Sequence, residues 1–272
     1  MSYSKNPMGN PIVKRVKSKF EAIQHIAEVF VSGQSAQRGL LVSGDAGTGK
    51  SHYIKLAFIA TGTTKKVDYQ KSKTFTPPAL YAKLWENRMP GDVVVFDDCS
   101  LESMTGEAFR KFTSWIKGGL ELSKGPKMLG YEAASKNALF EELGVPSEFD
   151  FQGSIIWITN TRFERLAKKF GDHWDAVKGR FIPVEVFLTK EEKYMYTNYL
   201  IEEVDMLGEK CEAKEGGYSD EIIANTLDYL NENYDNFKEI TPRVAIKVAD
   251  TMEMYPLVWK NILNQHDIYD NE

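Results

Sequence analysis

Residues 44–51 have the sequence GDAGTGKS, and they follow directly on the apolar run GLLVS at 39–43. The glycines of this stretch allow tight and left-handed backbone conformations, so successive N–H groups can point at one phosphate group. The run SHYIKLAFIAT at 51–61 predicts a helix with one apolar face, which directs its positive N-terminus at the same group. The stretch therefore predicts a strand, a phosphate-binding loop and a helix, in that order.

The loop also has the side chains that nucleotide binding requires. It fits the pattern G-x-x-x-x-G-K-[ST] at every fixed position, with Lys50 as a mobile charge for the β- and γ-phosphates and Ser51 as a hydroxyl ligand for Mg²⁺. The alternative is a solvated glycine-rich loop with a stray lysine, which the order of strand, loop and helix disfavours. The predicted nucleotide-binding residues are Gly44, Asp45, Ala46, Gly47, Thr48, Gly49, Lys50 and Ser51.

A second strand is expected to bring a carboxylate to the metal. The segment GDVVVFDDCS at 91–100 has an apolar run that ends in two aspartates, as expected for a central parallel strand with polar residues at its C-terminal end. Ligands of α/β proteins bind at this end of the strands. We therefore predict that Asp97 holds Mg²⁺ through a coordinated water and that Asp98 polarises the attacking water. The alternative is an acidic turn after a buried strand.

A third apolar segment, SIIWITN at 154–160, also ends in a polar side chain, Asn160. Its amide is expected to reach the γ-phosphate or to hold the attacking water. A cap or turn role explains an asparagine at a strand end equally well.

Two arginines further along the chain are candidates for stabilising phosphate charge. Arg180 lies between a helical segment and the strand IPVEVFL at 182–188, a position that suits a finger acting on a neighbour's γ-phosphate. Arg243 follows Thr241, a predicted N-cap, and Pro242 in the first turn of a helix.

The composition is that of an ordinary soluble globular protein, with 42% hydrophobic and 27% charged residues in 272. The net charge of −5 excludes a generally basic nucleic-acid coat but permits a local basic loop. No apolar run is long enough to span a membrane, and the N-terminal segment lacks the apolar centre of a secretory signal, so we expect a cytoplasmic protein. Cys99 and Cys211 imply neither a disulfide framework nor a zinc site.

The pattern of elements divides the chain into two parts. Residues 1–190 alternate strands and helices, which predicts a parallel sheet with crossover helices. Residues 191–272 have only helical patterns, with a glycine-rich break at KEGGYSDE, and predict a small helical lid domain.

Together, the phosphate loop GDAGTGKS, the strand VVVFDD, the strand end WITN, KGRF before a strand and TPR opening a late helix resemble the AAA+ ATPases. The chain is similar in particular to the compact AAA+ ATPases encoded by bacteriophages, over roughly residues 20–255. The resemblance implies a three-layer αβα P-loop domain with a helical lid, and ATP hydrolysis at the subunit interfaces of a homo-oligomer, a hexameric ring. It assigns Lys50 and Ser51 to the Walker A motif, Asp97 to Walker B, Asn160 to sensor 1, Arg180 to the arginine finger and Arg243 to sensor 2.

One position departs from the family. The residue after the metal-binding aspartate is usually glutamate, and Asp98 is one methylene shorter. The water then sits closer, hydrolysis is slow, or the residue is mainly structural. Arg162 and Arg165 compete with Arg180 for the role of finger.

Residues 118–153 are too long for a simple connection. The stretch GGLELSKGPKMLGYEAA predicts a hairpin whose SKGP turn joins LEL to KMLGY, followed by a short helix. In similar ring ATPases a hairpin at this place points into the central pore. The predicted pore residues are Lys124 and Lys127 in this turn, and Lys71, Lys73 and Phe75 after an earlier strand. Solvated charged turns are the alternative.

Three functions compete. The first is an oligomeric ATPase acting on nucleic acid or a nucleoprotein complex, such as a replication or recombination accessory or a helicase loader. The second is a ring ATPase that remodels a protein complex through the same pore, and the third is a monomeric P-loop kinase. A kinase has no use for a trans-acting Arg180, and clustered pore lysines favour a polyanion, so we favour nucleic acid.

Overall fold

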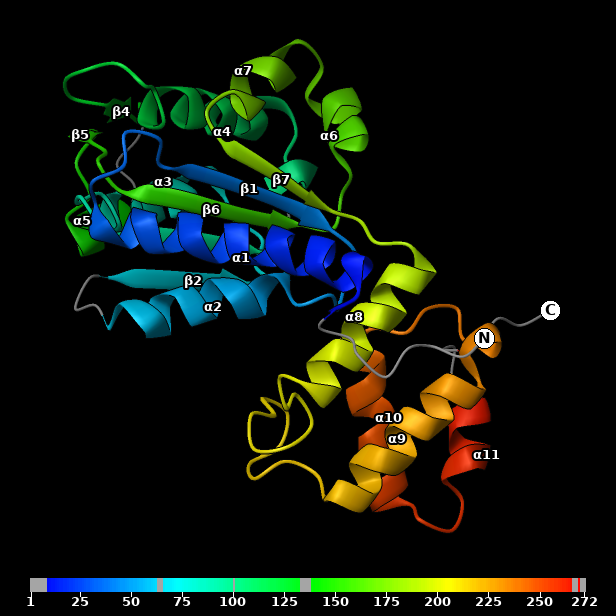
Figure 1. Ribbon diagram of the computed structural model, residues 1–272. Helices are drawn as coiled ribbons and strands as arrows, with labels where there is room; N and C mark the ends of the chain where they lie inside the picture. The colour runs from blue at the N-terminus through cyan, green and yellow to red at the C-terminus, as the bar shows by residue number, and fades with distance from the viewer. Residues whose placement is uncertain (1–8, 63–65, 100, 133–137, 266–268, 270–272) are drawn as a thin grey trace. The chain divides into compact units, whose positions relative to one another are not determined.

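The computed structural model describes residues 9–62, 66–99, 101–132, 138–265 and 269 (Figure 1). The chain forms two compact units. The α/β unit comprises residues 21–44 and 50–186, and the helical unit comprises residues 1–20, 45–49 and 187–272. Because this division assigns two N-terminal segments to the helical unit, a domain boundary at residue 190 remains a prediction.

A five-stranded sheet forms the centre of the α/β unit, and all its neighbouring strands are parallel. In spatial order the strands are β2 (Val67–Lys71), β3 (Val93–Asp97), β6 (Ser154–Thr159), β1 (Gly39–Gly44) and β7 (Ile182–Val186). The expected parallel sheet is therefore confirmed. Because the strands are parallel, the residues that follow β1, β3 and β6 emerge at one edge of the sheet, and the residues that precede β7 lie at the other.

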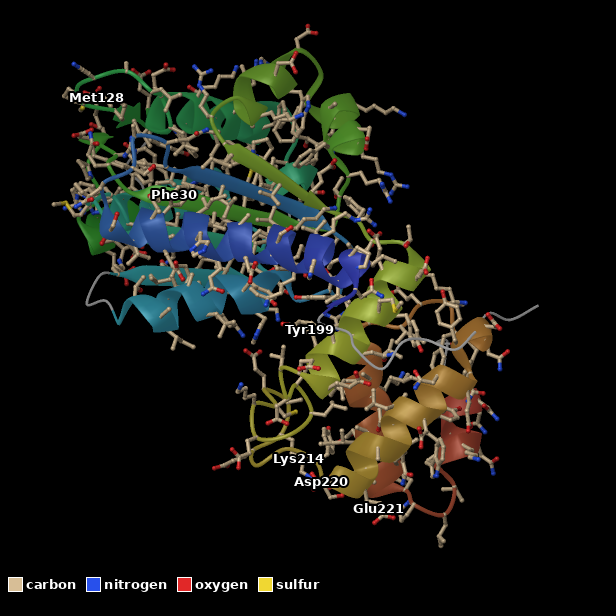
Figure 2. All side chains as sticks on the ribbon, in the orientation of Figure 1. Phe30, Met128, Tyr199, Lys214, Asp220 and Glu221 are labelled. Carbon is tan, nitrogen blue, oxygen red and sulfur yellow. The ribbon has the colours of Figure 1, made fainter. Side chains whose placement is uncertain are left out.

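Helices cover both faces of this sheet, which explains why β1, β3 and β6 are apolar and buried at almost every position. On one face, Phe96 and Trp157 pack against α3 (Pro77–Glu86), α4 (Gly106–Gly119), α6 (Phe163–Phe170) and α7 (Trp174–Lys178). On the other face lie α2 (Lys50–Thr61) and the second half of α1 (Pro11–Ser32), whose Phe30 is buried (Figure 2). This is the three-layer αβα architecture that the sequence predicts.

The antiparallel pair in this unit differs from the predicted hairpin. The strand β4 (Met128–Gly130) pairs with β5 (Glu148–Asp150), and not with the LEL segment at 120–122. The physical reason is that α4 continues to Gly119, and Leu120 then caps this helix as a buried residue. A short helix, α5 (Ala138–Leu143), lies between the two strands in the sequence, as predicted.

The helical unit contains the late helices that the sequence predicts. They are α8 (Lys190–Glu202), α9 (Asp220–Glu232) and α10 (Pro242–Met254), followed by α11 (Trp259–Asn264). Thr189 forms a capping box with Glu192, and the Thr241 hydroxyl accepts a hydrogen bond from the Val244 N–H, so both helices begin at a polar cap. The core of the unit centres on Leu207, Phe237 and similar buried side chains.

The described residues also include the short 3-10 helices η2 (Leu101–Ser103), η3 (Gly171–His173) and η4 (Tyr234–Asn236). In the described part of the chain, none of the helices combines the length and the apolar character that crossing a membrane requires.

Candidate nucleotide site

Polar side chains from three parallel strands and the start of α2 meet at the C-terminal edge of the sheet. Lys50, the first residue of α2, is 6% exposed, and its ammonium donates hydrogen bonds to Gly44 O at 2.8 Å and Asn160 Oδ1 at 2.9 Å. The Asn160 amide nitrogen in turn donates to Asp98 Oδ1 at 2.7 Å. Because β6 lies between β1 and β3, the amide of Asn160 connects the lysine to the carboxylate that follows β3.

The predicted metal ligands also lie together. Ser51 Oγ donates a hydrogen bond to Asp97 Oδ2 at 2.7 Å, and Asp97 is buried, with 2% of its surface exposed. A second hydroxyl, that of Tyr69 on the neighbouring strand β2, donates to the same oxygen at 2.6 Å. Burial and this bond to Asp97 raise the pKa of the Tyr69 phenol well above its usual range, so Tyr69 remains a donor.

Tyr69 is a site residue that the sequence alone does not predict. The segment VDYQK has no apolar run, and only its register with β3, which places Tyr69 opposite Val95, brings the hydroxyl within reach of Asp97. One sequence signal could have predicted this residue. It is a tyrosine two residues before the end of the strand that neighbours β3.

Asp98 has a backbone conformation that bears on the departure from glutamate. Its φ is +50°, in the left-handed region, where aspartate and asparagine occur several times more often than other non-glycine residues. The local backbone therefore favours the shorter acid at this position. Asp98 is exposed, whereas Asp97 before it is buried.

Residues 45–49 of the phosphate loop belong to the helical unit, where two glycines have the left-handed backbone that the motif requires. The φ angles are +73° at Gly47 and +103° at Gly49. A Cβ on Gly47 would lie 3.2 Å from the Cβ of Arg243, so this arginine packs directly on the loop. Arg243, which the sequence predicts to stabilise phosphate charge, therefore contacts the phosphate loop itself.

A buried lysine outside the predicted site residues holds the carboxylate of Asp45, the second residue of this loop. Lys193 of α8 is 9% exposed, and its ammonium lies 3.0 Å from Asp45 Oδ2 and 2.5 Å from Glu239 Oε2. Burial disfavours the charged ammonium, but its hydrogen bonds to Glu239 and Asp45 outweigh that effect and raise its pKa. Asp45 also accepts a hydrogen bond from the Leu188 N–H, which fixes its carboxylate.

The finger candidates lie at different edges of the sheet. Arg180 lies two residues before β7, and its carbonyl oxygen approaches Gly39 at the start of β1, so it lies at the edge opposite to Lys50 and Asp97. Its guanidinium forms an ion pair with Glu121. Arg162 and Arg165 follow β6, at the same edge as Asn160.

Two of the predicted pore residues are not available for that role. The side chain of Lys127 is 6% exposed, because its ammonium turns back into its own loop and donates to Ser123 and to Gly125 O. The prediction of a charged ring at Lys127 was therefore wrong. Phe75 is partly buried and packs edge-on against Phe96 of the core, with ring centroids 5.4 Å apart.

Three predicted pore lysines remain exposed: Lys71, Lys73 and Lys124. Lys71 ends β2 opposite Asp97, at the C-terminal edge of the sheet. Lys124 belongs to the loop after α4, whose end at Leu120 contacts the start of β1. The two groups therefore come from opposite edges of the sheet and do not form one cluster in a single chain.

The strand order β2-β3-β6-β1-β7, with the phosphate loop after β1 and the paired aspartates after β3, defines the class of protein: the chain has the fold of the AAA+ P-loop ATPases. Its solved neighbours include a point mutant of RuvB from Thermotoga maritima, with a TM-score of 0.53 and 15% identity over 96% of this chain and 73% of RuvB. NtrX from Brucella abortus in complex with ATP has a TM-score of 0.52 and 13% identity, over 97% of this chain and 51% of NtrX.

The sequence also matches a phage protein and a family model. The chain is 24% identical over 253 residues to the "Uncharacterized 36.7 kDa protein in nrdC-mobD intergenic region" of Enterobacteria phage T4. This match covers 91% of the chain and 73% of the phage protein. A family model described as "Protein of unknown function (DUF815)" matches residues 10–144.

Proposed function

We propose that this chain is an ATPase that binds Mg-ATP at the phosphate loop and hydrolyses it. The observation that carries the proposal is the hydrogen-bonded series from Lys50 through Asn160 to Asp98, beside the pair of Ser51 and Asp97. A lysine, a hydroxyl, a buried carboxylate and an exposed carboxylate are the groups that phosphoryl transfer to water requires. NtrX, whose fold the chain shares, has been solved with ATP bound.

The residues present fit a magnesium ion. Mg²⁺ takes oxygen ligands, keeps several of its waters and is usually bound through one or two carboxylates together with the phosphates of the substrate. Ser51 Oγ and Asp97 Oδ2, 2.7 Å apart, are such oxygens. Bound at this position, the ion would neutralise charge that develops on the phosphates.

The roles of the other residues follow from their contacts. Lys50 binds the phosphates and exchanges its bond to Gly44 O for a bond to a phosphate oxygen. Asn160 orients Asp98 through Oδ1, which leaves Oδ2 to accept a proton from the attacking water. Arg243, packed on Gly47, stabilises charge next to the loop.

We further propose that the active site is completed by a second copy of the chain, in a ring of six. Arg180 lies at the edge of the sheet opposite to Lys50, so it cannot reach the phosphates bound by its own α/β unit. A phosphate on a neighbouring copy is the target that its position allows. Arg162 and Arg165 lie at the edge that carries Asn160, so they fit a trans-acting role less well than Arg180.

We propose that the ring acts on nucleic acid, free or in a nucleoprotein complex. The phage relative supports a location in the cytoplasm of an infected host cell. The supporting observation is that Lys71, Lys73 and Lys124 are exposed. Lysines bind the phosphate backbone without regard to sequence. A protein complex is the second candidate, but the partly buried Phe75 packs against Phe96, so it is less available as the aromatic side chain of a polypeptide-gripping loop.

The experiment that tests the ATPase proposal is calorimetry of Mg-ATP binding to the wild type and to Lys50→Ala. We expect the variant to lose binding, because Lys50 is the mobile cation of the loop. Lys168→Ala, which removes an exposed lysine of α6, is the matched control and should bind normally. Wild-type affinity in Lys50→Ala would refute the assignment of the phosphate loop.

The nucleic-acid target is tested by the ATPase rate with single-stranded DNA, double-stranded DNA or RNA present. We expect stimulation that Lys71→Ala and Lys73→Ala reduce and that Lys127→Ala leaves unchanged. An equal rate with and without every polynucleotide would exclude nucleic acid and favour a protein target.

A further inference from the structure

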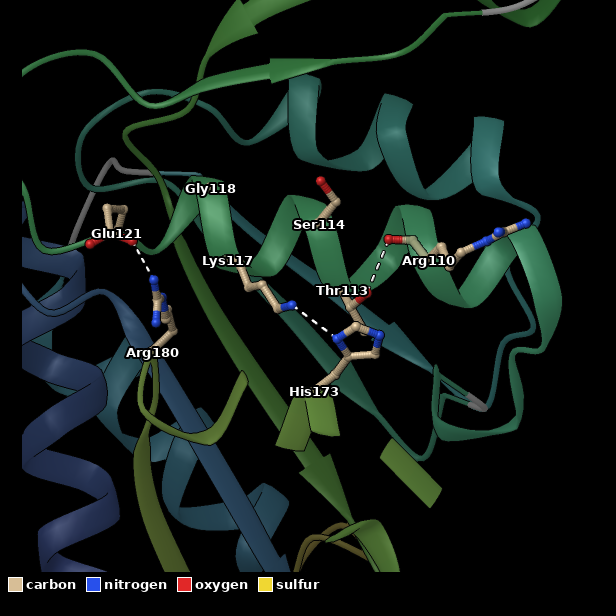
Figure 3. Close-up of a pocket in the computed structure, with 8 residues that line it drawn as sticks. All are labelled: Arg110, Thr113, Ser114, Lys117, Gly118, Glu121, His173 and Arg180. Atoms are coloured by element: carbon tan, nitrogen blue, oxygen red, sulfur yellow. Dashed lines mark hydrogen bonds and ion pairs between the residues drawn. The ribbon is translucent and has the colours of Figure 1, made fainter. Parts of the chain in front are cut away.

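A pocket of about 560 Å³ lies beside Arg180, in the α/β unit (Figure 3). One face of α4 forms most of its wall, and η3 and the turn before β7 form the rest. The opposite face of α4 is the buried one, with Phe112, Trp115 and Ile116. The volume is within the range of roughly 300–1,000 Å³ that small-ligand sites have.

The pocket is positively charged, although the chain has a net charge of −5. Its lining includes Arg110, Lys117 and Arg180 against a single carboxylate, Glu121. Positive charge inside a concave surface attracts anions more strongly than the same charge on a convex one. The charge of the pocket therefore favours an anion over a cation or a neutral molecule.

Lys117 is the cation whose charge is least neutralised. Its ammonium lies 3.1 Å from Nδ1 of His173, and the two side chains point toward one another across the pocket (Figure 3). An ammonium can only donate, so Nδ1 is the unprotonated acceptor of this ring. The ring is held in place by Phe109, with centroids 6.0 Å apart. Among the described residues, Lys117 has no carboxylate partner that would cancel its charge.

Arg180 is in the opposite situation, because Glu121 holds its guanidinium in an ion pair (Figure 3). Both side chains are partly exposed, so an incoming anion can compete for the guanidinium. Arg110 extends away from the pair of Lys117 and His173 in Figure 3, so it contributes long-range attraction more than direct contact.

We propose that this pocket receives the terminal phosphates of a nucleotide held by a second copy of the chain, with Lys117 contacting them beside Arg180. Glu121 is a latch that holds Arg180 until the phosphates displace it. This proposal rests on the proposed ATPase function and adds to it a second trans-acting cation, Lys117, and a carboxylate that opposes the finger. Two cations on neighbouring elements match the multiple charges of a triphosphate better than one arginine does.

The ion pair of Glu121 with Arg180 predicts how substitutions change the affinity of the pocket for phosphate. In a chain without a neighbour, Glu121 compensates the charge of Arg180 and lowers the affinity of the pocket for anions. Removing the carboxylate charge by Glu121→Gln should strengthen phosphate binding in the pocket. Removing the ammonium by Lys117→Gln should weaken it.

The first measurement detects the pocket directly in the Lys50→Ala background, where the phosphate loop of the same chain is disabled. Inorganic tripolyphosphate is titrated at low salt into protein labelled at histidine, and the ring resonance of His173 is followed by NMR. The resonance is identified by its loss in His173→Gln. We expect this resonance to shift as tripolyphosphate is added. In Glu121→Gln the shift should occur at a several-fold lower tripolyphosphate concentration. In Lys117→Gln it should occur at a several-fold higher concentration or be absent.

The second measurement is the ATPase rate at saturating ATP and high protein concentration. We expect Lys117→Gln to reduce the rate about tenfold without loss of ATP affinity, while the control Lys168→Ala remains at the wild-type rate. A wild-type rate in Lys117→Gln overturns the proposal. If Arg180→Ala is impaired in the same assay, the trans-acting finger survives that result. If Arg180→Ala is also normal, the trans-acting finger fails as well, while the binding and hydrolysis of ATP by the chain stand.

Two further outcomes decide the ligand and the latch. The His173 resonance could shift with tripolyphosphate while Lys117→Gln keeps a normal ATPase rate. This result would show that the pocket binds phosphate from another source, and it would overturn the assignment to a neighbour's nucleotide. Weaker tripolyphosphate binding in Glu121→Gln would overturn the latch.

Discussion

The phenolic hydroxyl of Tyr69 donates a hydrogen bond to Asp97 Oδ2 over 2.6 Å, from the strand next to the one that ends in Asp97. Ser51 donates to the same oxygen, so two hydroxyls fix the orientation of a buried carboxylate. Groups that orient a metal ligand from behind commonly affect metal affinity or activity by about 10- to 100-fold. Tyr69 is therefore a positioning residue in the proposed ATPase.

Tyr69→Phe should lower the ATPase rate about tenfold and raise the Mg²⁺ concentration needed for half-maximal rate. The cause is the loss of one of the two donors that hold Asp97. The measurement is the rate as a function of Mg²⁺ at saturating ATP, with the exposed Tyr255→Phe as control. If the Mg²⁺ dependence is the same as in the wild type, Tyr69 contributes only to packing.

Asp98→Glu should fold less stably and should not hydrolyse ATP faster than the wild type. The backbone at this position has φ +50°, which aspartate tolerates better than glutamate, and the longer side chain displaces the carboxylate from Asn160. Asp98→Asn should retain ATP binding and lose hydrolysis, because an amide is no base. Single-turnover rates and ATP calorimetry check both variants, and a faster Asp98→Glu enzyme would show that the short acid limits catalysis.

Tyr81 provides a test of stability against pH in the core of the α/β unit. It is fully buried, and its hydroxyl donates to Leu129 O at 3.0 Å and Ser147 O at 2.9 Å. Tyr81→Phe removes this donor from two carbonyls, so we expect it to lower the free energy of unfolding by about 1–2 kcal/mol at pH 8.

The effect should shrink at high pH. Burial raises the pKa of Tyr81 above its unfolded value of about 10, so its contribution is complete below pH 10 and is lost as the pH rises beyond that value. Urea denaturation at pH 8 and pH 11 measures the difference between wild type and variant. Tyr255→Phe, at an exposed position, should show no difference at either pH. A difference that stays constant with pH would contradict the burial effect.

The edge of the sheet that holds Lys50, Asp97 and Asn160 was predictable because parallel strands bring their C-terminal ends together, whatever the details of packing. The contribution of Tyr69 was not predictable, because it depends on the register between β2 and β3. A half-buried strand without an apolar run gives no sequence signal of its register. The prediction that Lys127 projects into a pore failed for a related reason. A lysine in a turn suggests solvent, but here the ammonium fills the hydrogen-bonding capacity of its own loop.

The ion pair of Arg180 with Glu121, at the edge of the sheet away from Lys50, leads to a prediction about assembly. If Arg180 acts on a neighbour's phosphate, the site is incomplete in a single chain, and specific activity must rise with protein concentration. Arg180→Ala should bind ATP through its own loop nearly as the wild type does, yet hydrolyse it about 10³-fold more slowly, at the lower end of what an arginine finger contributes.

The decisive measurement mixes Arg180→Ala with Lys50→Ala, each of which is inactive alone. In a mixed assembly, some interfaces combine the intact Lys50 of one variant with the intact Arg180 of the other, so activity should return in proportion to those interfaces. Arg165→Ala is the matched control, because it removes an exposed arginine that follows β6, and it should keep the wild-type rate. A mixture without activity, combined with a wild-type rate that does not depend on protein concentration, would exclude the trans-acting finger and make the chain a monomeric P-loop enzyme.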